Sequence, residues 1–598
     1  MLDEPKQIER LDALLVHIQA ASMPWMFQRQ AQLGLYYLAQ HATDKGFKVL
    51  VDNLSSNDNI VRRLSRILNE RKCHLVGFYV DQDNLWTLRR ILPPLKRLVP
   101  DLKVVLGGPQ VTTDPEFTLN NIPEAICGVV GEGEETFAEL LSLPNLNSEN
   151  LGKCRGLIIN VNGTLERTGL RELIEPLDRL SIPRRKKLSI DPKTVGATMI
   201  TGRGCVGRCA FCYEGGHHEH SKKIRLHSVK RSLEEFDYLV REFDRSYITI
   251  VDDSFVTNVS RLKEFCKEVK TKYGDKIKWF CESRVDVLAK NPDLLPTMIK
   301  AGLIRLQVGG ESGNQHILDL YGKGTTLEQM HTVVESAKKN GLLSIYANFI
   351  LGGACETQET YKKTRDFALG LLDLAPGCME VGSSFYTPYP GTRMYEKPEA
   401  FGIEVVDREV VTGAGDEHAF CKTQELSRFD ILAINLDFKR SVSQKMKELC
   451  KRLPLEVIKK HFQAFYNWNL STEWYEVLVG DQSRYAYFKS ILSGGAKDFA
   501  DITQQNFSEA YPWRTIDLVT SENGKFVIRT HNGNVRVLDE LENMVLELSA
   551  GKLSFDDIVT IISNRTPEIS KSTIREACIE RYDMFDKECL VVWKTNVL

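Results

Sequence analysis

The chain has 598 residues, which is too many for one hydrophobic core and suggests roughly three or four domains. Its 78 basic and 80 acidic side chains give a formal net charge of −2, so we expect no nucleic-acid partner. The 14 cysteines mostly stand alone, as in a reducing compartment. Neither a secretion signal nor an apolar run of about 20 residues is present, so we expect a cytoplasmic protein that does not enter a membrane.

Short apolar strands alternate with amphipathic helices from about residue 10 to residue 145. This alternation predicts an α/β domain with a doubly wound parallel sheet over residues 1–145. Strands are predicted at 11–18, 47–51, 74–80 and 103–106, and helices at 30–45, 59–70 and 85–98. Residues 146–195 are predicted to be a linker with one hairpin-like stretch that turns at Asn162-Gly163.

The alternation resumes over residues 196–402, with strands predicted at 197–201, 247–252, 278–281, 305–308 and 344–350. About six such units predict a partial or full parallel barrel with functional side chains at the carboxyl ends of its strands. We expect a helical extension over 403–524. A small domain over 525–598 is then predicted, in which three helices precede a last strand.

Three closely spaced cysteines are the most informative motif of the chain. Cys205, Cys209 and Cys212 have the spacing C-x3-C-x2-C. A structural zinc site takes four ligands and an ordinary ferredoxin cluster takes four thiolates, so three thiolates leave one metal position open for another ligand. The spacing alone also allows unrelated surface cysteines, or a zinc site completed by His217 or His218.

Gly204 before the first cysteine and Phe211 before the last make this loop resemble that of the radical S-adenosylmethionine (SAM) superfamily. The resemblance implies a [4Fe–4S] cluster held by Cys205, Cys209 and Cys212, with SAM bound at the fourth iron. It also implies an electron donor such as flavodoxin or ferredoxin, because one electron cleaves SAM to a 5′-deoxyadenosyl radical.

Charged side chains follow the next two predicted strands. Asp252 and Asp253 end one strand, where a carboxylate can face a ligand or cap the next helix. In the superfamily this position binds the SAM amino group, and the Asp-Asp-x-Phe form resembles that of cobalamin-dependent members. Glu282 and Arg284 end the next strand. There they would bind the ribose and the carboxylate of SAM, although such a pair is more often a surface ion pair.

Three further motifs follow in the order of the superfamily. Gly310, Glu311 and Ser312 belong to a Gly-x-Glu-Ser element, whose glycine allows close approach of a ligand and whose polar side chains can reach ribose. Residues 350–357 resemble the adenine-side motif, with Ala-Cys in place of the usual Pro-Gly. Residues 386–392 resemble a Pro-Gly-Thr segment of cobalamin-dependent members. Together, five matches over residues 200–392 predict a radical SAM domain.

Glycine-rich turns end two strands of the N-terminal domain. No G-x-G-x-x-G follows its first strand, which disfavours a nucleotide-binding domain. Gly107, Gly108 and Thr112 instead match the Gly-Gly-x-x-x-Thr element of the cobalamin-binding domain found in one class of radical SAM enzymes, and Gly131 and Glu132 match its acidic turn. The resemblance implies that these residues contact cobalamin.

The Asp-x-His-x-x-Gly motif, which places a histidine under cobalt in many cobalamin proteins, is absent. His17 and His41 lack its context, and we expect both to be ordinary structural histidines. We therefore expect base-off cobalamin without a histidine ligand. Its lower face would be covered by residues that follow the third predicted strand, such as Asp81 or Asn84.

The C-terminal block resembles the small winged-helix domains that bind peptides in enzymes modifying ribosomally made peptides; a structural cap fits the pattern equally well. DNA binding is disfavoured because Lys552, Lys571 and Arg575 are interleaved with acids. Together, the resemblances imply a cobalamin-dependent radical SAM methyltransferase that methylates a carbon centre of a small-molecule or peptide substrate, with a peptide or an amino-acid-derived natural product preferred. Two alternatives remain: an enzyme with the same cofactors that performs a cyclisation, ring contraction or rearrangement, and an inactive iron–sulfur sensor or binding protein.

Overall fold

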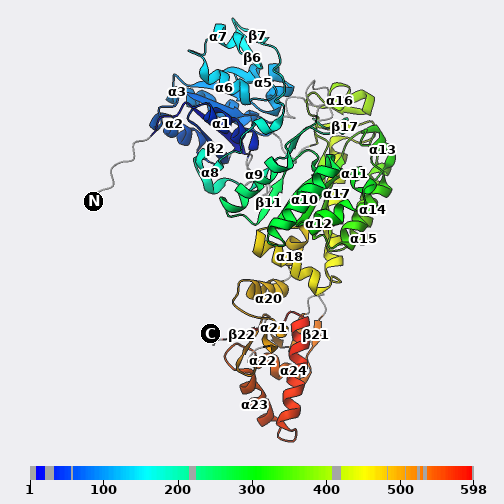
Figure 1. Ribbon diagram of the computed structural model, residues 1–598. Helices are drawn as coiled ribbons and strands as arrows, with labels where there is room; N and C mark the ends of the chain where they lie inside the picture. The colour runs from blue at the N-terminus through cyan, green and yellow to red at the C-terminus, as the bar shows by residue number, and fades with distance from the viewer. Residues whose placement is uncertain are drawn as a thin grey trace, which may run out of the picture. The chain divides into compact units, whose positions relative to one another are not determined.

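The computed structural model describes residues 9–19, 32–55, 58–213, 224–406, 419–480, 482–504, 507–516, 518–520, 526–529 and 535–595. The chain divides into two compact units (Figure 1). The first unit comprises residues 1–368 and 381–439, and the second comprises 369–380 and 440–598. In the described part of the chain, no helix is both long enough and apolar enough to cross a membrane.

A seven-stranded sheet with the order β2-β1-β3-β4-β5-β6-β7 forms the N-terminal domain. Its first five strands are parallel, which confirms the predicted doubly wound α/β fold. The strands are β1 (Ala13–Gln19), β2 (Val49–Ser55), β3 (Leu75–Tyr79), β4 (Lys103–Gly107), β5 (Ala125–Val129), β6 (Leu157–Val161) and β7 (Thr164–Arg167). The helices are α1 (Leu33–Asp44), α2 (Ile60–Glu70), α3 (Leu85–Leu98), α4 (Pro109–Thr113), α5 (Pro115–Asn121), α6 (Glu134–Ser142) and α7 (Ser148–Lys153).

The two faces of this sheet are covered by different helices. Leu14 and Val76 point to one face, where they share a buried core with Leu64 of α2 and Leu88 of α3. Helices α1 and α6 pack against each other on the opposite face. Alternating strand residues therefore supply a fully packed core on one side and, on the other, the wall of the cavity described below.

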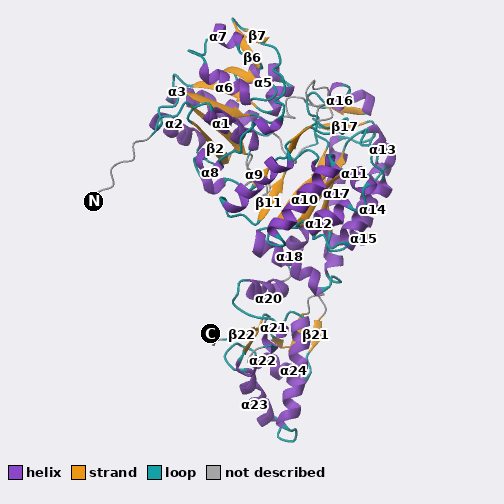
Figure 2. Cartoon of the chain, viewed as in Figure 1, coloured by secondary structure: helices purple, strands orange, loops and turns teal. Residues whose placement is uncertain are grey.

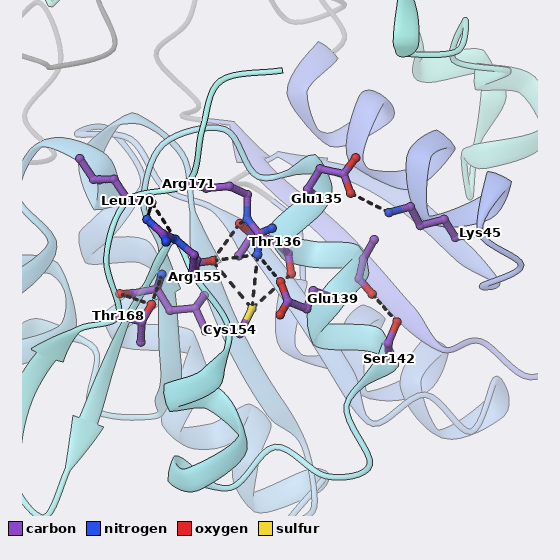
Figure 3. A network of polar contacts seen from close by, with 12 residues as sticks. Lys45, Glu135, Thr136, Glu139, Ser142, Cys154, Arg155, Thr168, Leu170 and Arg171 are labelled. Atoms are coloured by element: carbon purple, nitrogen blue, oxygen red, sulfur yellow. Dashed lines mark hydrogen bonds and ion pairs between the residues drawn. The ribbon is translucent and has the colours of Figure 1, made fainter. Parts of the chain in front are cut away.

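The hairpin β6–β7 extends the sheet beyond residue 145, where the sequence predicted a linker over 146–195. β6 pairs antiparallel with β5, so the hairpin covers what would otherwise be an open sheet edge. The chain after β7 is then tied to α6 (Figure 3). Arg171 donates to Thr136 Oγ1 at 2.9 Å and pairs with Glu139, while Arg155 Nη2 donates to the Leu170 carbonyl at 2.7 Å. These contacts hold helix α6 in place.

The second sheet has six strands in the order β15-β14-β13-β12-β11-β8. β15 and β8 lie at opposite edges, so the described strands form an open, partial barrel. Its strands are β8 (Thr198–Met199), β11 (Tyr247–Ile250), β12 (Lys278–Ser283), β13 (Leu303–Glu311), β14 (Ser344–Leu351) and β15 (Met379–Phe385). Its helices are α9 (Val229–Arg241), α10 (Val259–Tyr273), α11 (Val285–Lys290), α12 (Leu294–Lys300), α13 (Gln315–Leu320), α14 (Leu327–Lys339) and α15 (Gln358–Leu374).

Short elements connect and follow the two sheets. They are α8 (Arg185–Leu188), the antiparallel pair β9 (Gly202–Arg203) and β10 (Arg225–Leu226), α16 (Arg393–Glu396), and the antiparallel pair β16 (Ile403–Val405) and β17 (Cys421–Thr423). The long helix α17 (Arg428–Cys450) runs from the first unit into the second.

The second unit is mainly helical (Figure 2). Its helices are α18 (Leu455–Trp468), α19 (Glu473–Val479), α20 (Gln482–Leu492), α21 (Phe499–Thr503), α22 (Glu540–Leu548), α23 (Phe555–Arg565) and α24 (Lys571–Lys587). Its strands are β18 (Tyr511–Arg514), β19 (Val519–Thr520), β20 (Phe526–Arg529), β21 (Val535–Val537) and β22 (Val591–Lys594). Phe555, Tyr582 and Trp593 lie in its buried core, and Ser554 caps α23 through a bond from the Asp557 amide.

Candidate functional site

A cavity of about 570 Å³ lies between the two sheets of the first unit. The N-terminal domain contributes Leu15 and Gly77 from its sheet, Leu38 from α1, and the turns that follow β4 and β5. The barrel contributes Thr198, Ile200, Gly204, Val251 and Asp253. The cavity therefore opens at the carboxyl ends of strands from both domains, where parallel α/β sheets bind ligands.

The predicted glycine-rich turns meet at this cavity. Thr112 Oγ1 donates to the Gly108 carbonyl at 3.0 Å and accepts from the Gly131 amide at 3.1 Å, so one hydroxyl joins the turns after β4 and β5. Gly108 has a φ of +106°, and a Cβ there would lie 2.7 Å from the Val80 carbonyl oxygen. A Cβ on Gly107 would meet nothing nearer than Val129 Cβ at 3.8 Å. Gly108 thus permits the turn, whereas Gly107 leaves space in the cavity.

Asp81 and Asn84, the residues predicted to cover the lower face of cobalamin, lie in the turn after β3. Asp81 and Asn84 are not among the cavity-lining residues, whereas Tyr79 is. Asn84 Nδ2 donates to the Tyr79 carbonyl at 2.9 Å and its Oδ1 accepts from the Asp81 amide at 3.2 Å. Asp81 Oδ1 in turn accepts from the Asn84 amide at 3.0 Å, so these two polar side chains build the turn after β3. His17 is buried edge-on against the Tyr79 ring, with centroids 5.4 Å apart, and burial lowers its pKa to about 4.

Glu132 connects the domains, although the sequence suggested that it contacts cobalamin. Its carboxylate accepts hydrogen bonds from Arg203 of β9 and Arg225 of β10. Burial alone would raise the pKa of Glu132, but the hydrogen bond from Arg225 and the charge of Arg203 outweigh it and hold the pKa at about 2. A carboxylate with these partners is committed to the domain interface, even though it borders the cavity.

The three-cysteine loop follows β9 directly. Its backbone is anchored at Ala210, whose amide donates to the Tyr321 carbonyl at 2.7 Å and whose carbonyl accepts from the Met394 amide at 3.1 Å. Phe211 packs edge-on against Tyr321, with centroids 5.0 Å apart. A Cβ on Gly207 would lie 3.4 Å from Cys205 Sγ and 3.6 Å from Cys209 Sγ. Two of the three sulfurs therefore flank one glycine on a firmly held loop.

The donor set of the loop, three thiolates, is of the kind that holds an iron–sulfur cluster. Among the described residues, no three His, Cys, Asp or Glu side chains converge as a mononuclear site requires. A cluster distributes its thiolates over several irons, so its ligands do not have to converge on one metal ion. His217 and His218, the predicted alternative zinc ligands, lie outside the described residues.

Arg284 lies against the cysteine loop. Its Nε donates to Asp286 Oδ1 at 3.0 Å and its Nη2 to the Lys323 carbonyl at 2.6 Å, which occupies the two groups that would fork onto a SAM carboxylate. Its Nη1 lies 2.7 Å from the position of a Cβ on Gly207. The guanidinium thus places a positive charge near Cys205 and Cys209. Burial would lower the pKa of Arg284, but the charge and hydrogen bond of Asp286, followed by the charges of Cys209 and Cys205, raise it.

We predict that Arg284→Gln makes the midpoint potential of the reconstituted cluster more negative, on the order of tens of millivolts, because a nearby cation favours the reduced, more negative state. The measurement is a redox titration followed by electron paramagnetic resonance. Arg208→Gln is the matched control, since Arg208 belongs to the same loop but is exposed and screened by water. Equal potentials for Arg284→Gln and the unsubstituted protein would contradict this role.

The two aspartates after β11 have different surroundings. Asp252 is 3% exposed and accepts from the amide and the hydroxyl of Thr201, both at 2.5 Å. It therefore fixes the chain before β9 and is not free to bind SAM. Asp253 lines the cavity and accepts from the Gly204 amide at 3.3 Å. Of the two predicted residues, Asp253 is the one positioned to meet a ligand beside the cysteine loop.

Glu282 and Glu311 end the two following strands, and the sequence did not identify their neighbour Lys323. Lys323 Nζ donates to Glu311 Oε1 at 2.6 Å in a nearly buried pair. Lys323 stands between Gly322 and Gly324, both with positive φ, and this Gly-Lys-Gly turn was the available sequence signal. The strand ends thus combine carboxylates with one buried ammonium group.

Gly310 and Ser312 serve the fold of the same turn. A Cβ on Gly310 would lie 3.0 Å from the Phe349 ring, so the glycine allows β13 and β14 to pack closely. Ser312 Oγ lies 3.2 Å from Thr364 Oγ1 and accepts from the Asn314 amide at 3.1 Å. These partners are internal to the fold, whereas the Glu311 carboxylate pairs with Lys323.

We predict that Glu282 contributes stability to the cofactor-free protein that is lost as pH rises from about 4.5 to 7. Buried histidines such as His17, whose pKa is lowered to about 4, contribute in the opposite direction up to about pH 6.5. Burial, then the charge of Asp253, raises the pKa of Glu282 from 4.5 to about 7. Between these values Glu282 binds more protons in the folded protein than in the unfolded chain, so its contribution to the free energy of unfolding decreases with pH. Glu282→Gln should gain about 1–2 kcal/mol at pH 8 and little at pH 4.5.

Thermal unfolding at both pH values, with exposed Glu399 replaced by Gln as control, checks this expectation. Asp81 and Glu356 also have pKa values raised to about 7 by burial, so part of this pH dependence should remain in the Glu282 variant. An unchanged pH dependence in Glu282→Gln would mean that its carboxyl is not buried in solution.

The N-terminal domain is a doubly wound sheet with two glycine-rich turns, and the barrel carries the three-cysteine loop. The two domains border one cavity, and this combination defines a radical SAM enzyme with a cobalamin-binding domain. Residues 28–141 match the family described as B12 binding domain, and residues 199–368 match the Radical SAM superfamily. The chain belongs to the cobalamin-dependent radical SAM enzymes. Its cofactors are cobalamin, SAM and a [4Fe–4S] cluster, as predicted from the sequence.

Two curated relatives each match about three fifths of the chain. The uncharacterized methyltransferase PH0819 of Pyrococcus horikoshii is 32% identical over 61% of this chain and 77% of its own length. The anaerobic magnesium-protoporphyrin IX monomethyl ester cyclase of Rubrivivax gelatinosus is 27% identical over 62% of this chain and 67% of its own. The cobalamin-dependent SAM radical enzyme OxsB with aqua-cobalamin has a similar fold, with a TM-score of 0.54 and 14% identity over 98% of this chain and 85% of OxsB.

Proposed function

We propose that the protein transfers a methyl group from SAM to a carbon centre of its substrate. The observation that carries the proposal is a cavity lined both by Gly107 and Gly131 of one domain and by Gly204 and Asp253 of the other. When bound, SAM with the cluster supplies a hydrogen-abstracting radical, and cobalamin supplies a transferable methyl group. Carbon methylation needs both chemistries at one substrate atom, and a shared cavity meets that requirement.

The chain's own residues provide binding and exclusion of water. Asp253 offers a carboxylate to an ammonium group beside the cysteine loop. Glu282 offers an acceptor for ribose hydroxyls, and Lys323, held by Glu311, offers a cation for a carboxylate. The cavity wall is largely apolar, as at Leu15 and Ile200. An apolar wall keeps water away from a reactive carbon centre.

The substrate class and the partners are part of the proposal. A peptide or amino-acid-derived natural product fits a second unit that has its own core and a winged-helix-like order of elements. An electron donor such as flavodoxin or ferredoxin would supply the electron for SAM cleavage, and an oxygen-sensitive cluster favours the cytoplasm. The balanced charge of the chain argues against a nucleic-acid partner.

A second candidate function is cyclisation or rearrangement without methyl transfer. It is favoured by the relative from Rubrivivax gelatinosus, whose name is that of a cyclase and whose similarity covers 62% of this chain. The two functions share every cofactor-side residue described above. They differ in the fate of the SAM methyl group.

An assay with methyl-labelled SAM separates these functions. Reconstituted protein, a chemical reductant and a small-molecule and peptide extract of the source organism are incubated without oxygen. Methyl transfer predicts labelled product together with both S-adenosylhomocysteine and 5′-deoxyadenosine. Cyclisation or rearrangement predicts 5′-deoxyadenosine without labelled product. An inactive sensor predicts neither nucleoside, and this result would refute both enzymatic proposals.

A further inference from the structure

Two arginines form the base of the cysteine loop. Arg203 of β9 and Arg225 of β10 are paired directly across a short antiparallel ribbon. Cys205 follows Arg203 by two residues, and the chain returns to the ribbon at Arg225 after Cys212. Any shift of this ribbon therefore moves both ends of the segment that holds the three cysteines.

Both arginines bind one turn of the cobalamin-binding domain. Arg203 Nη1 lies 2.6 Å from Glu132 Oε1, and its other amino group pairs with Glu134. Arg225 Nη2 lies 2.9 Å from Glu132 Oε1 and its Nη1 3.0 Å from Oε2. The exposed fractions are 18% for the Arg203 side chain, 7% for Arg225 and 16% for Glu132. Charged groups so well shielded from water hold a defined geometry because separating them would leave buried charges unpaired.

The same turn borders the cofactor cavity. Gly131, directly before Glu132, is bonded to Thr112, which also holds the Gly108 turn. Gly131 and Glu132 line the cavity together with Gly107 and Gly108. A group that fills the cavity therefore contacts the turn that carries Glu132 and Glu134. These two carboxylates form the ion pairs with the arginines at the base of the cysteine loop.

We infer that Arg203 and Arg225 are positioning residues that couple cobalamin binding to SAM binding at the cluster. Cobalamin in the cavity fixes the Gly131–Glu134 turn, and the ion pairs pass this constraint to the β9–β10 ribbon. Binding of each cofactor then favours binding of the other by the same factor, because coupling between two sites is reciprocal. The inference concerns cofactor binding alone and goes beyond the proposed methyl transfer.

The test compares the dissociation constant of hydroxocobalamin with and without saturating SAM in the cluster-reconstituted full chain. We expect SAM to tighten binding by roughly tenfold in the unsubstituted protein, within the range usual for coupled sites. Glu132→Gln and Arg225→Gln should bring this ratio close to one, while Arg225→Lys keeps a charge and should restore part of it. Arg167→Gln, which removes an exposed ion pair with Glu116 in the same domain, should leave the ratio unchanged.

A second readout is the rate at which an iron chelator removes the cluster. Hydroxocobalamin should slow this loss in the unsubstituted protein and in Arg167→Gln, but not in Arg225→Gln. If Arg225→Gln fails to fold, Arg225→Lys decides the question through its intermediate ratio. A ratio of one in the unsubstituted protein, or an undiminished ratio in Glu132→Gln and Arg225→Gln, would overturn the inference.

Discussion

Replacing Cys209 with alanine should abolish SAM cleavage and the iron–sulfur absorption of the protein, while the N-terminal domain keeps its fold and its cobalamin. Cys209 is 6% exposed, and the loop that carries it is fixed on both sides of Ala210. The loop is too constrained to bring another ligand into the vacated place, and a cluster with one open iron cannot lose a further thiolate. The same complete loss is expected for Cys205→Ala and Cys212→Ala.

Iron and sulfide quantitation and 5′-deoxyadenosine formation from SAM measure this effect, and the bound corrinoid reports on the first domain. Cys578→Ala is the control, because Cys578 belongs to helix α24 of the second unit and not to the unit that carries the cysteine loop. Full cluster content in any of the three alanine variants would contradict the assignment. So would Mössbauer spectra showing four protein ligands on the unsubstituted cluster.

Local patterns predicted much of this fold. The predicted helix 85–98 has the same bounds as α3, and strand 103–106 differs from β4 by one residue, because buried apolar periodicity defines such elements within a short window. The Asn162-Gly163 turn was also visible, but not that its hairpin pairs with β5. Strand pairing depends on the rest of the sheet. The sequence therefore predicted only a linker over 146–195 and missed that strands β6 and β7 extend the first sheet.

For the candidate site, too, the sequence predicted local features but not contacts between residues distant in the chain. Motif order identified the cofactors, since their binding loops are local in sequence. The roles of Glu132, Asp252 and Arg284 depend on partners distant in the chain: Arg225 lies 93 residues from Glu132, and Thr201 lies 51 residues from Asp252. A sequence motif gives the chemical type of a side chain, whereas its partner decides whether that group remains available to a ligand.

Replacing Gly107 with valine should expel cobalamin and leave the cluster and SAM cleavage intact. A Cβ at Gly107 projects toward open space, with Val129 Cβ 3.8 Å away, so the added methyl groups occupy cavity volume without straining the backbone. We expect the nucleotide tail of cobalamin to need this space between the strand ends and the helices. We expect the affinity for hydroxocobalamin to fall by roughly tenfold or more, measured by absorbance titration, with Gly107→Ala intermediate.

A substitution at the neighbouring Gly108 serves to distinguish the effect of filling the cavity from the effect of destabilising the fold. At Gly108 a side chain would meet the Val80 carbonyl at 2.7 Å in a left-handed backbone conformation, so Gly108→Val should lower the melting temperature as well as cobalamin binding. Gly152→Val, on exposed helix α7, should change neither. If Gly107→Val retained full corrinoid content and a normal melting temperature, the cavity would not hold the tail of cobalamin. Methyl transfer through this cavity would then have to be abandoned, because the two cofactors would no longer share one site.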